Sequence, residues 1–175
     1  MIHSFPCRSD FRRELTSAIV PVCALKTATG ERVWRTKLGS DVGEYAIGPT
    51  VAGGRVFVST RANTRRGPKP HNFRGAITAL DAKTGEILWT APHPPSGYAS
   101  AEDLLVVDGL VWCGETTSVG NSGIFTGRDL RTGEIVREFP PDDWQPHMSH
   151  HRCYRAKATN KYILASRTGI EFVDV

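Results

Sequence analysis

The sequence lacks the features that mark several large protein classes. No apolar run in the 175 residues approaches the roughly 20 residues that a transmembrane helix needs. Charges between Arg8 and Glu14 interrupt the apolar core that an N-terminal secretory signal would require. No segment carries a convincing helical periodicity. We therefore expect no transmembrane segment and no helical fold, and the N-terminus does not decide the compartment.

Cysteine is scarce, and its positions form no recognisable pattern. Cys7, Cys23, Cys113 and Cys153 include no adjacent pair and no C-x-x-C, so their spacing predicts neither a zinc knuckle nor a redox motif. Cys113 lies in the apolar stretch LVWCGE, where we expect a buried thiol that packs as a small apolar side chain. The disulfide state of the four residues stays open.

The charge is weakly positive and partly local. The formal net charge is +4, and residues 61–74 hold a cluster of cations, namely Arg61, Arg65, Arg66, Lys69 and Arg74. Such a loop can attract an anionic partner, but charge contributes solubility first. Because this stretch has a single aromatic residue, Phe73, it offers no stacking platform for bases. We expect a solvated loop and no nucleic-acid partner.

The chain does contain one segment that occurs three times with small changes. Residues 24–34 read ALKTATGERVW, residues 79–89 read ALDAKTGEILW, and residues 127–137 read GRDLRTGEIVR. The shared glycines, Gly30, Gly85 and Gly133, are 55 and then 48 residues apart. A repeat of about 50 residues built from short strands indicates a solenoid, a propeller or a similar array.

Each repeat has the pattern of four short antiparallel strands. In the clearest unit we expect strands at 48–52, 55–60 and 75–82, and a fourth that starts at 87 and ends before Pro92. Tight turns fall at 53–54 and 83–86. Four-stranded sheets repeated in this way are the blades of a β-propeller. The expected organisation is all-β, with an irregular segment 1–21, a partial blade 22–46, blades 47–91 and 103–139, and a partial blade 156–175.

Two whole and two partial blades are few for a closed ring, which has roughly four to eight. We therefore expect an incomplete propeller, either a fragment of a larger one or one half of an assembly. Unpaired strands and uncovered apolar faces at its two open edges favour self-association.

Residues 79–89 fit A-x-D-x-x-T-G-x-x-x-W at every fixed position, and in this they resemble the tryptophan-docking repeat of pyrroloquinoline-quinone (PQQ) type β-propellers. The first copy departs at Lys26, and the third has Gly127 for Ala and Arg137 for Trp. The resemblance implies that Trp34 and Trp89 pack on the turns of neighbouring blades. The turn glycines Gly30, Gly85 and Gly133 would permit the close approach.

This family includes quinoprotein dehydrogenases, which hold PQQ with Ca²⁺ and carry adjacent cysteines, and cofactor-free scaffolds such as an outer-membrane assembly lipoprotein. Residues 147–172 are similar to a stretch of large bacterial PQQ-like repeat proteins. The resemblance suggests the periplasm or cell envelope. Because the chain has no cysteine pair and no recognised catalytic motif, we expect a non-catalytic scaffold or a ligand- or protein-binding module without cofactor. The alternative is a segment of a PQQ-dependent oxidoreductase with PQQ and Ca²⁺.

The expected topology places the short turns on one face and the long connections, at 61–74, 92–102, 116–122 and 140–155, on the other. Long loops on a rigid scaffold are where binding usually occurs, so a protein or small-molecule ligand is expected on the long-loop face. The candidate binding residues are His147, His150, His151, Arg152 and Tyr154. Nothing in their spacing forces three or four ligands onto one metal ion. The structural alternative is a loop that anchors the next blade, and no residue is assigned a catalytic role.

Overall fold

A computed structural model describes the chain at residues 21–38, 45–61, 75–93, 104–114, 124–139, 157–165 and 171–174. Every regular element in these ranges is a β-strand, and every pairing between them is antiparallel. The all-β fold class expected from the sequence is therefore confirmed. Within the same ranges, no helix has the length and apolar character needed to cross a membrane.

The strands of the described residues form four sheets in which spatial order follows chain order. The first sheet pairs β1 (Pro21–Leu25) with β2 (Arg32–Lys37). The second contains β3 (Tyr45–Ala52), β4 (Arg55–Arg61), β5 (Gly75–Asp81) and β6 (Ile87–His93). The third contains β7 (Leu105–Val107), β8 (Leu110–Gly114), β9 (Phe125–Asp129) and β10 (Ile135–Phe139). The fourth contains β11 (Lys157–Ala158), β12 (Tyr162–Ala165) and β13 (Glu171–Asp174).

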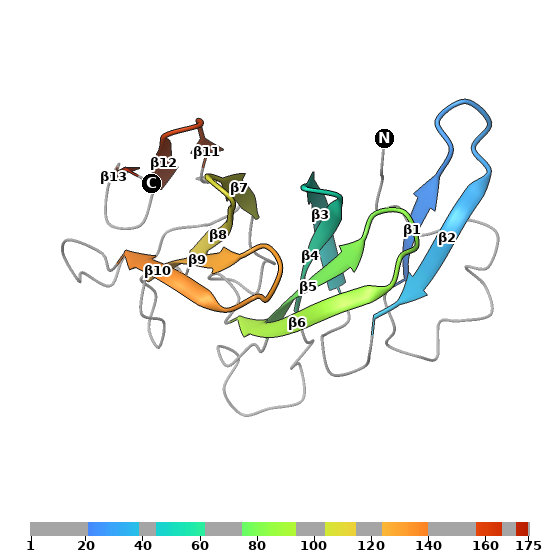
Figure 1. Cartoon of the computed structure of the whole chain (residues 1–175), viewed down its shortest axis with the longest axis horizontal. Coiled ribbons are helices and arrows are strands. Elements are labelled where there is room, and N and C mark those ends of the chain that lie inside the picture. The colour runs from blue at the N-terminus through green and yellow to red at the C-terminus, as the bar shows by residue number, and fades with distance from the viewer. Residues whose placement is uncertain are drawn as a thin grey trace.

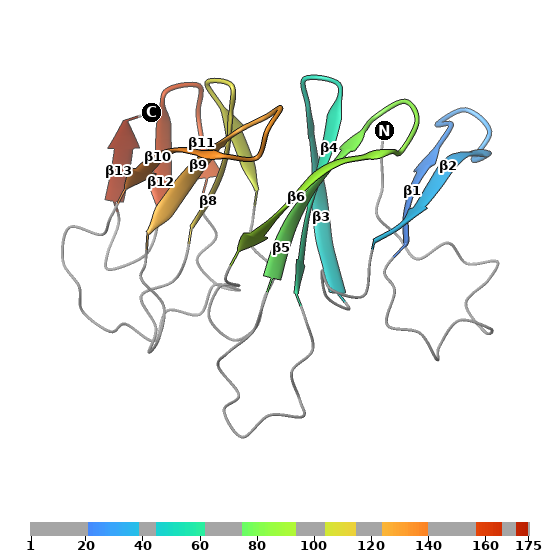
Figure 2. The same ribbon diagram turned by 60° about the horizontal axis from the view of Figure 1, so that its bottom comes forward.

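The sheets stand side by side in an arc, as blades do in a propeller (Figure 1). Strand β3 contacts β7, and β7 contacts β11, so the first strands of three successive sheets line the inner side of the arc. Strands β6 and β10 lie on the outer side. When the molecule is turned, the tight turns within the sheets are seen together along one face (Figure 2).

The tight turns form where the sequence supplies residues that tolerate positive φ. Gly53 and Gly54 connect β3 to β4 with φ of 54° and 71°, and Asp108 and Gly109 connect β7 to β8 with φ of 49° and 73°. Two consecutive positive φ angles characterise the hairpin turn whose twist matches that of antiparallel strands. The hairpin at Gly53 and Gly54 is therefore as the sequence predicts, and the hairpin at Asp108 and Gly109 follows the same rule.

A β-bulge that was not expected from the sequence recurs in the last strand of each of the first three sheets. The register of β5 and β6 shifts between Ala79 and Leu80, so that Ile87 and Leu88 together oppose Leu80. The same shift occurs between β1 and β2 and between β9 and β10. After each bulge the bulky end of the motif opposes a small residue: Trp34 faces Ala24, Trp89 faces Ala79, and Arg137 faces Gly127. A bulge re-aims a side chain by increasing the local twist.

The apolar core lies between the sheets rather than within any one of them. In the second sheet, alternate residues face opposite sides, as the twofold period of a strand requires. Val56, Val58 and Leu80 pack with the first sheet, whereas Phe57 and Ile77 pack with the third sheet. A further cluster joins the third and fourth sheets and contains Val107, Trp112, Phe125 and Ile163. Each sheet therefore depends on its neighbours for burial.

Proline is tolerated in the outer strand β6, which corrects one expected boundary. The strand was expected to end before Pro92, but it continues to His93 with Pro92 opposite Ala76. Strand β6 is the last in its sheet, so the missing N–H of Pro92 interrupts no ladder on that side. Strand β3, at the other edge, likewise contains Pro49 and has an irregular register between Ile47 and Thr50.

Candidate functional site

The predicted ligand residues His147, His150, His151, Arg152 and Tyr154 lie outside the described residues. Their role stays a prediction. The structure describes the two strands that flank their segment: β10 ends at Phe139, before it, and β11 begins at Lys157, after it.

The departure point at Phe139 is fixed by aromatic packing. The Phe139 ring stacks on Trp112 with centroids 5.2 Å apart and planes 12° apart. Trp112 is fully buried, and its Nε1 donates a hydrogen bond to the Val107 carbonyl oxygen at 3.2 Å. A buried aromatic ring with its N–H satisfied is a rigid support. The long connection after Phe139 therefore starts from an ordered position in the third sheet.

In the second sheet, a row of residues lies at the same end of the fold as Phe139. The backbone register aligns Tyr45, Arg61, Gly75 and His93 across its four strands. This row lies at the strand ends opposite the tight turns (Figure 2). Sequence reasoning placed Arg61 in a loop and did not bring it into one row with Tyr45 and His93, because only the strand register shows this alignment.

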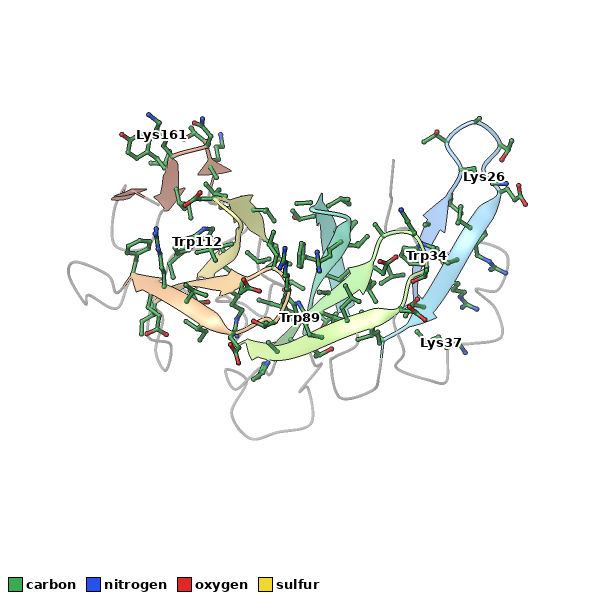
Figure 3. The ribbon with its side chains drawn as sticks, viewed as in Figure 1. Lys26, Trp34, Lys37, Trp89, Trp112 and Lys161 are labelled. Atoms are coloured by element: carbon green, nitrogen blue, oxygen red, sulfur yellow. The ribbon has the colours of Figure 1, made fainter. Side chains whose placement is uncertain are left out.

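The first blade junction is built around Trp34, one of the predicted docking residues (Figure 3). Trp34 Nε1 donates to the Ala82 carbonyl oxygen at 3.0 Å. A Cβ atom on Gly85 would lie 2.6 Å from the indole ring, so no larger residue fits there without movement. The Thr36 hydroxyl donates to the Gly85 carbonyl oxygen. The second strand of one sheet thus contacts the turn of the next sheet through an apolar ring and two hydrogen bonds.

The second junction repeats this contact with Trp89. Its Nε1 donates to the Leu130 carbonyl oxygen at 3.0 Å, and a Cβ atom on Gly133 would lie 2.6 Å from its ring. The Gly133 carbonyl oxygen accepts its side-chain hydrogen bond from its own sheet, from Arg128 Nη1 at 2.7 Å. Arg128 Nη2 crosses the junction and donates to the Pro92 carbonyl oxygen at 3.1 Å. Sequence reasoning missed Arg128, although it stands where the other copies have leucine.

The turns under the indole rings are shaped by the aspartate of the motif. Asp81 Oδ1 accepts hydrogen bonds from the backbone N–H groups of Thr84 at 2.9 Å and Lys83 at 2.8 Å. Asp129 does the same for Thr132 at 2.9 Å and Arg131 at 2.7 Å. These donors lower the pKa of both carboxyl groups below its ordinary value, since they favour the charged form.

The first copy shapes its turn without an aspartate. Lys26 takes that position, and its Nζ lies 2.7 Å from Glu31 Oε2 in an exposed ion pair. The backbone bonds of the turn are retained: Lys26 N donates to the Glu31 carbonyl oxygen and Gly30 N donates to the Lys26 carbonyl oxygen, both at 2.8 Å. The three turns therefore share one backbone form.

Within the described residues, no group of three or more His, Cys, Asp or Glu side chains is placed to hold a metal ion. A shallow, open depression of about 680 Å³ follows the first blade junction and is lined by residues 35–37 and 84–88. The two described cysteines, Cys23 and Cys113, are buried in different sheets, and the expected burial of Cys113 is confirmed.

The stacked four-stranded sheets, the core between them and the repeated indole contacts define a segment of a β-propeller. A family model described as "Outer membrane protein assembly factor BamB" matches residues 17–140. Because this match covers more than half of the sequence, the chain belongs to the PQQ-like repeat family of BamB-type β-propellers.

The known proteins that the chain resembles are of different kinds. The chain is 35% identical to a polyvinylalcohol dehydrogenase of Pseudomonas sp. over 72 residues, which is 38% of the chain and 11% of that protein. BamB from Moraxella catarrhalis matches 88% of the chain with a TM-score of 0.53 at 19% identity. The quinohemoprotein alcohol dehydrogenase ADHIIG from Pseudomonas putida HK5 matches 88% with a TM-score of 0.55 at 17% identity.

These similarities concern part of each relative. The chain spans 39% of the BamB structure, 30% of the ADHIIG structure and 11% of the polyvinylalcohol dehydrogenase. The two structural matches are below 25% identity and establish the fold alone. The fold hosts many functions, so an activity has to be argued from a site.

Proposed function

We propose that this chain is a non-catalytic propeller segment that presents a binding surface for a protein or a small molecule on the face opposite its tight turns. The observation that carries the proposal is the separation of the two faces. Two of the tight turns, those that contain Gly85 and Gly133, are used in contacts between sheets. The strand ends on the opposite face (Figure 2) are where the chain enters and leaves the long connections.

Two features of the described strands support the proposed binding surface. Phe139, at the start of the segment that contains the histidine cluster, stacks on the fully buried Trp112. In the second sheet, the row of Tyr45, Arg61 and His93 lies at the same end. Loops that depart from a rigid scaffold are suited to binding because the scaffold limits the entropy lost when they are ordered.

The alternative is a segment of a PQQ-dependent oxidoreductase, and the identity of 35% to a polyvinylalcohol dehydrogenase over 72 residues favours it. The residues of the chain do not fit that chemistry. The adjacent cysteines that the family resemblance requires are absent, since Cys7, Cys23, Cys113 and Cys153 are all separated. The two described cysteines lie in different sheets, Cys23 in β1 and Cys113 in β8.

A titration with PQQ and Ca²⁺ separates the two functions. The chain is mixed with both, and the absorbance of bound quinone is followed together with the reduction of a redox dye in the presence of an alcohol. We expect neither a saturable quinone signal nor dye reduction. A saturable quinone signal accompanied by dye reduction would show that the chain is part of an oxidoreductase and would contradict the proposed non-catalytic function.

The position of the binding surface can be tested by site-specific photocross-linking. A photoreactive amino acid is placed at His93, at the strand ends of the long-loop face, or at Lys83, in an exposed tight turn. In cells that express the chain, we expect a discrete cross-linked product from position 93 and none from position 83. Products from position 83 alone, or equal products from both positions, would contradict the proposed surface.

A further inference from the structure

The two blade junctions provide the same turn carbonyl with different side-chain donors. At the first junction the Gly85 carbonyl oxygen accepts a hydrogen bond from the Thr36 hydroxyl, which belongs to strand β2 of the preceding sheet. At the second junction the Gly133 carbonyl oxygen accepts from Arg128 Nη1 at 2.7 Å, and Arg128 belongs to strand β9 of the same sheet as the turn. The donor therefore comes from opposite sides of the two junctions.

The residue that corresponds to Thr36 in the second sheet is Ala91. Each of the two follows the indole of its strand, Trp34 or Trp89, by two residues. Side chains two positions apart on a strand lie on the same face, so both residues lie on the side of the next sheet. Ala91 is buried, with 8% of its surface exposed, and it has no hydroxyl. A turn that packs on Ala91 therefore needs a donor from another position.

Arg128 occupies the position that corresponds to Leu80. Leu80 is fully buried in the core shared with the first sheet, and Arg128 pairs with Val111, which belongs to the core shared with the second sheet. Arg128 is only 8% exposed, and its Nε atom is buried without a hydrogen-bond partner among the described residues. Burying a guanidinium costs desolvation free energy that a leucine does not cost. The arginine therefore needs a compensating role at this position.

The second contact of the guanidinium indicates that role. Arg128 Nη2 donates to the Pro92 carbonyl oxygen at 3.1 Å, across the junction. Pro92 directly follows Ala91, so the guanidinium reaches the outer strand of the preceding sheet beside the position that lacks a hydroxyl. A threonine at position 91 and the arginine would both donate to one acceptor, the Gly133 carbonyl oxygen.

We propose that these residues form two matched pairs, Thr36 with Leu80 and Ala91 with Arg128, which determine which outer strand packs on which turn. In a matched junction, one donor reaches the turn carbonyl. In a mismatched junction, threonine and arginine compete for one acceptor, or alanine and leucine leave the carbonyl without its side-chain donor, which is costly for a buried group.

The proposed consequence is specificity in the order of the sheets. A chain built from similar repeats can pack the wrong pair of sheets together, and the indole contact is the same at both junctions. The matched pairs differ between the junctions, so they penalise a wrong order. Arg128 is then a specificity-determining residue of the second junction. This proposal does not rest on the binding surface proposed above.

The test is a double-mutant cycle in the full chain, with thermal unfolding midpoints measured at one protein concentration. Arg128→Leu is expected to lower the midpoint by about 5 °C, because two carbonyl groups lose their donor. Ala91→Thr is expected to lower the midpoint in the otherwise wild-type chain. In the Arg128→Leu background the same substitution is expected to raise it and to recover roughly half of the loss, since one of the two carbonyls regains a donor.

A matched control separates the hydrogen bond from the filling of space. Valine has nearly the shape of threonine but no hydroxyl, so Ala91→Val is expected to recover nothing in the Arg128→Leu background. Arg128→Lys keeps the charge but lacks the planar fork that reaches two acceptors, and it is expected to lower the midpoint by an intermediate amount.

The cycle also gives an answer where Arg128→Leu abolishes the cooperative transition. In that case Ala91→Thr is expected to restore the transition and Ala91→Val is not. Additive changes in the four proteins of the cycle would overturn the proposal. Equal recovery by threonine and valine would also overturn it, as would a failure of Ala91→Thr to restore a lost transition.

Discussion

Each indole at a blade junction combines an apolar contact with a directed hydrogen bond. Trp34 and Trp89 bury a ring face against a glycine and satisfy Nε1 on a backbone carbonyl of the next sheet. Glycine is required beneath the ring for two separate reasons: Gly85 and Gly133 have positive φ, and a Cβ atom would enter the ring. The same residue thus permits the turn and the contact.

We expect Trp89→Ala to lower the free energy of unfolding by about 3 kcal/mol, the low end for losing a buried aromatic side chain, because the ring is only partly buried. The variant also leaves the Leu130 carbonyl without its donor. Denaturant unfolding measures the change, with Leu88→Ala as control because Leu88 is 43% exposed on the same strand. Equal losses in the two variants would show that Trp89 does not dock.

The turn aspartates make stability depend on pH. The pKa of Asp81 is lowered chiefly by the backbone N–H of Thr84 and then by that of Lys83. A carboxyl whose pKa is lower in the folded state stabilises the protein above its unfolded pKa, ordinarily 3.8, and this stabilisation is lost as the pH falls through the folded pKa. The pKa of Asp129 is lowered in the same way by Thr132 and Arg131.

We therefore expect thermal stability to fall below about pH 4. A variant that combines Asp81→Asn and Asp129→Asn should be less stable than the wild type at pH 7. Its disadvantage should shrink as the pH falls through the folded-state pKa of the two aspartates. Parallel midpoint curves for the two proteins from pH 7 to pH 2 would contradict this role of the two carboxylates.

At the scale of elements, the recurring bulge joins the turn to the indole. In β6 the bulge of Ile87 and Leu88 opposes Leu80, and Trp89 then pairs with Ala79. The extra residue increases the local twist of the outer strand, which turns the ring toward the next sheet. The bulge residues Val33, Ile87, Leu88, Ile135 and Val136 are 43% to 57% exposed. They therefore contribute through the backbone twist of the bulge rather than through burial of their side chains.

Deleting Leu88 should remove the bulge and misdirect the Trp89 ring. We expect a loss of stability of about 2 kcal/mol in the otherwise wild-type chain and a clearly smaller loss when Trp89→Ala is already present, because coupled sites are not additive. Urea unfolding of the four proteins of this double-mutant cycle provides the measurement. Additive losses would show that the bulge and the ring act independently.

At the scale of the whole molecule, burial is shared between sheets. Each of the three core clusters draws residues from two neighbouring sheets, so stability is a property of adjacent pairs, as in repeat proteins. Among the described strands, β1 pairs only with β2 and leaves its other edge without a neighbouring strand. Exposed edges and apolar side chains favour association between molecules.

The isolated chain is therefore expected to self-associate through its open blade edges. Light scattering over a range of protein concentrations should give an average mass above 19.2 kDa that increases with concentration. A constant monomer mass at every concentration would contradict the prediction.

Several of these features could be predicted from the sequence because they depend on local rules. The glycines of the tight turns, the two-residue alternation of the strands and the threefold Thr-Gly-Glu repeat predicted four-stranded blades, and the family match agrees. The course of β6 through Pro92 was not predicted, because only the position of the strand at the edge of its sheet makes proline acceptable. Arg128 was missed because its two acceptors, on Gly133 and Pro92, come from different sheets.

The sequence by itself determined the repeating unit, since turn chemistry and strand periodicity act over a few residues and leave a visible pattern. Only the tertiary structure decided which partner each repeated residue receives. Trp34 and Trp89 lie on the turns at Gly85 and Gly133, while the turn at Gly30 receives no described ring. The physical reason is that these contacts join residues 41 to 49 positions apart, and the stacking order of the sheets, not the local sequence, sets which of them meet.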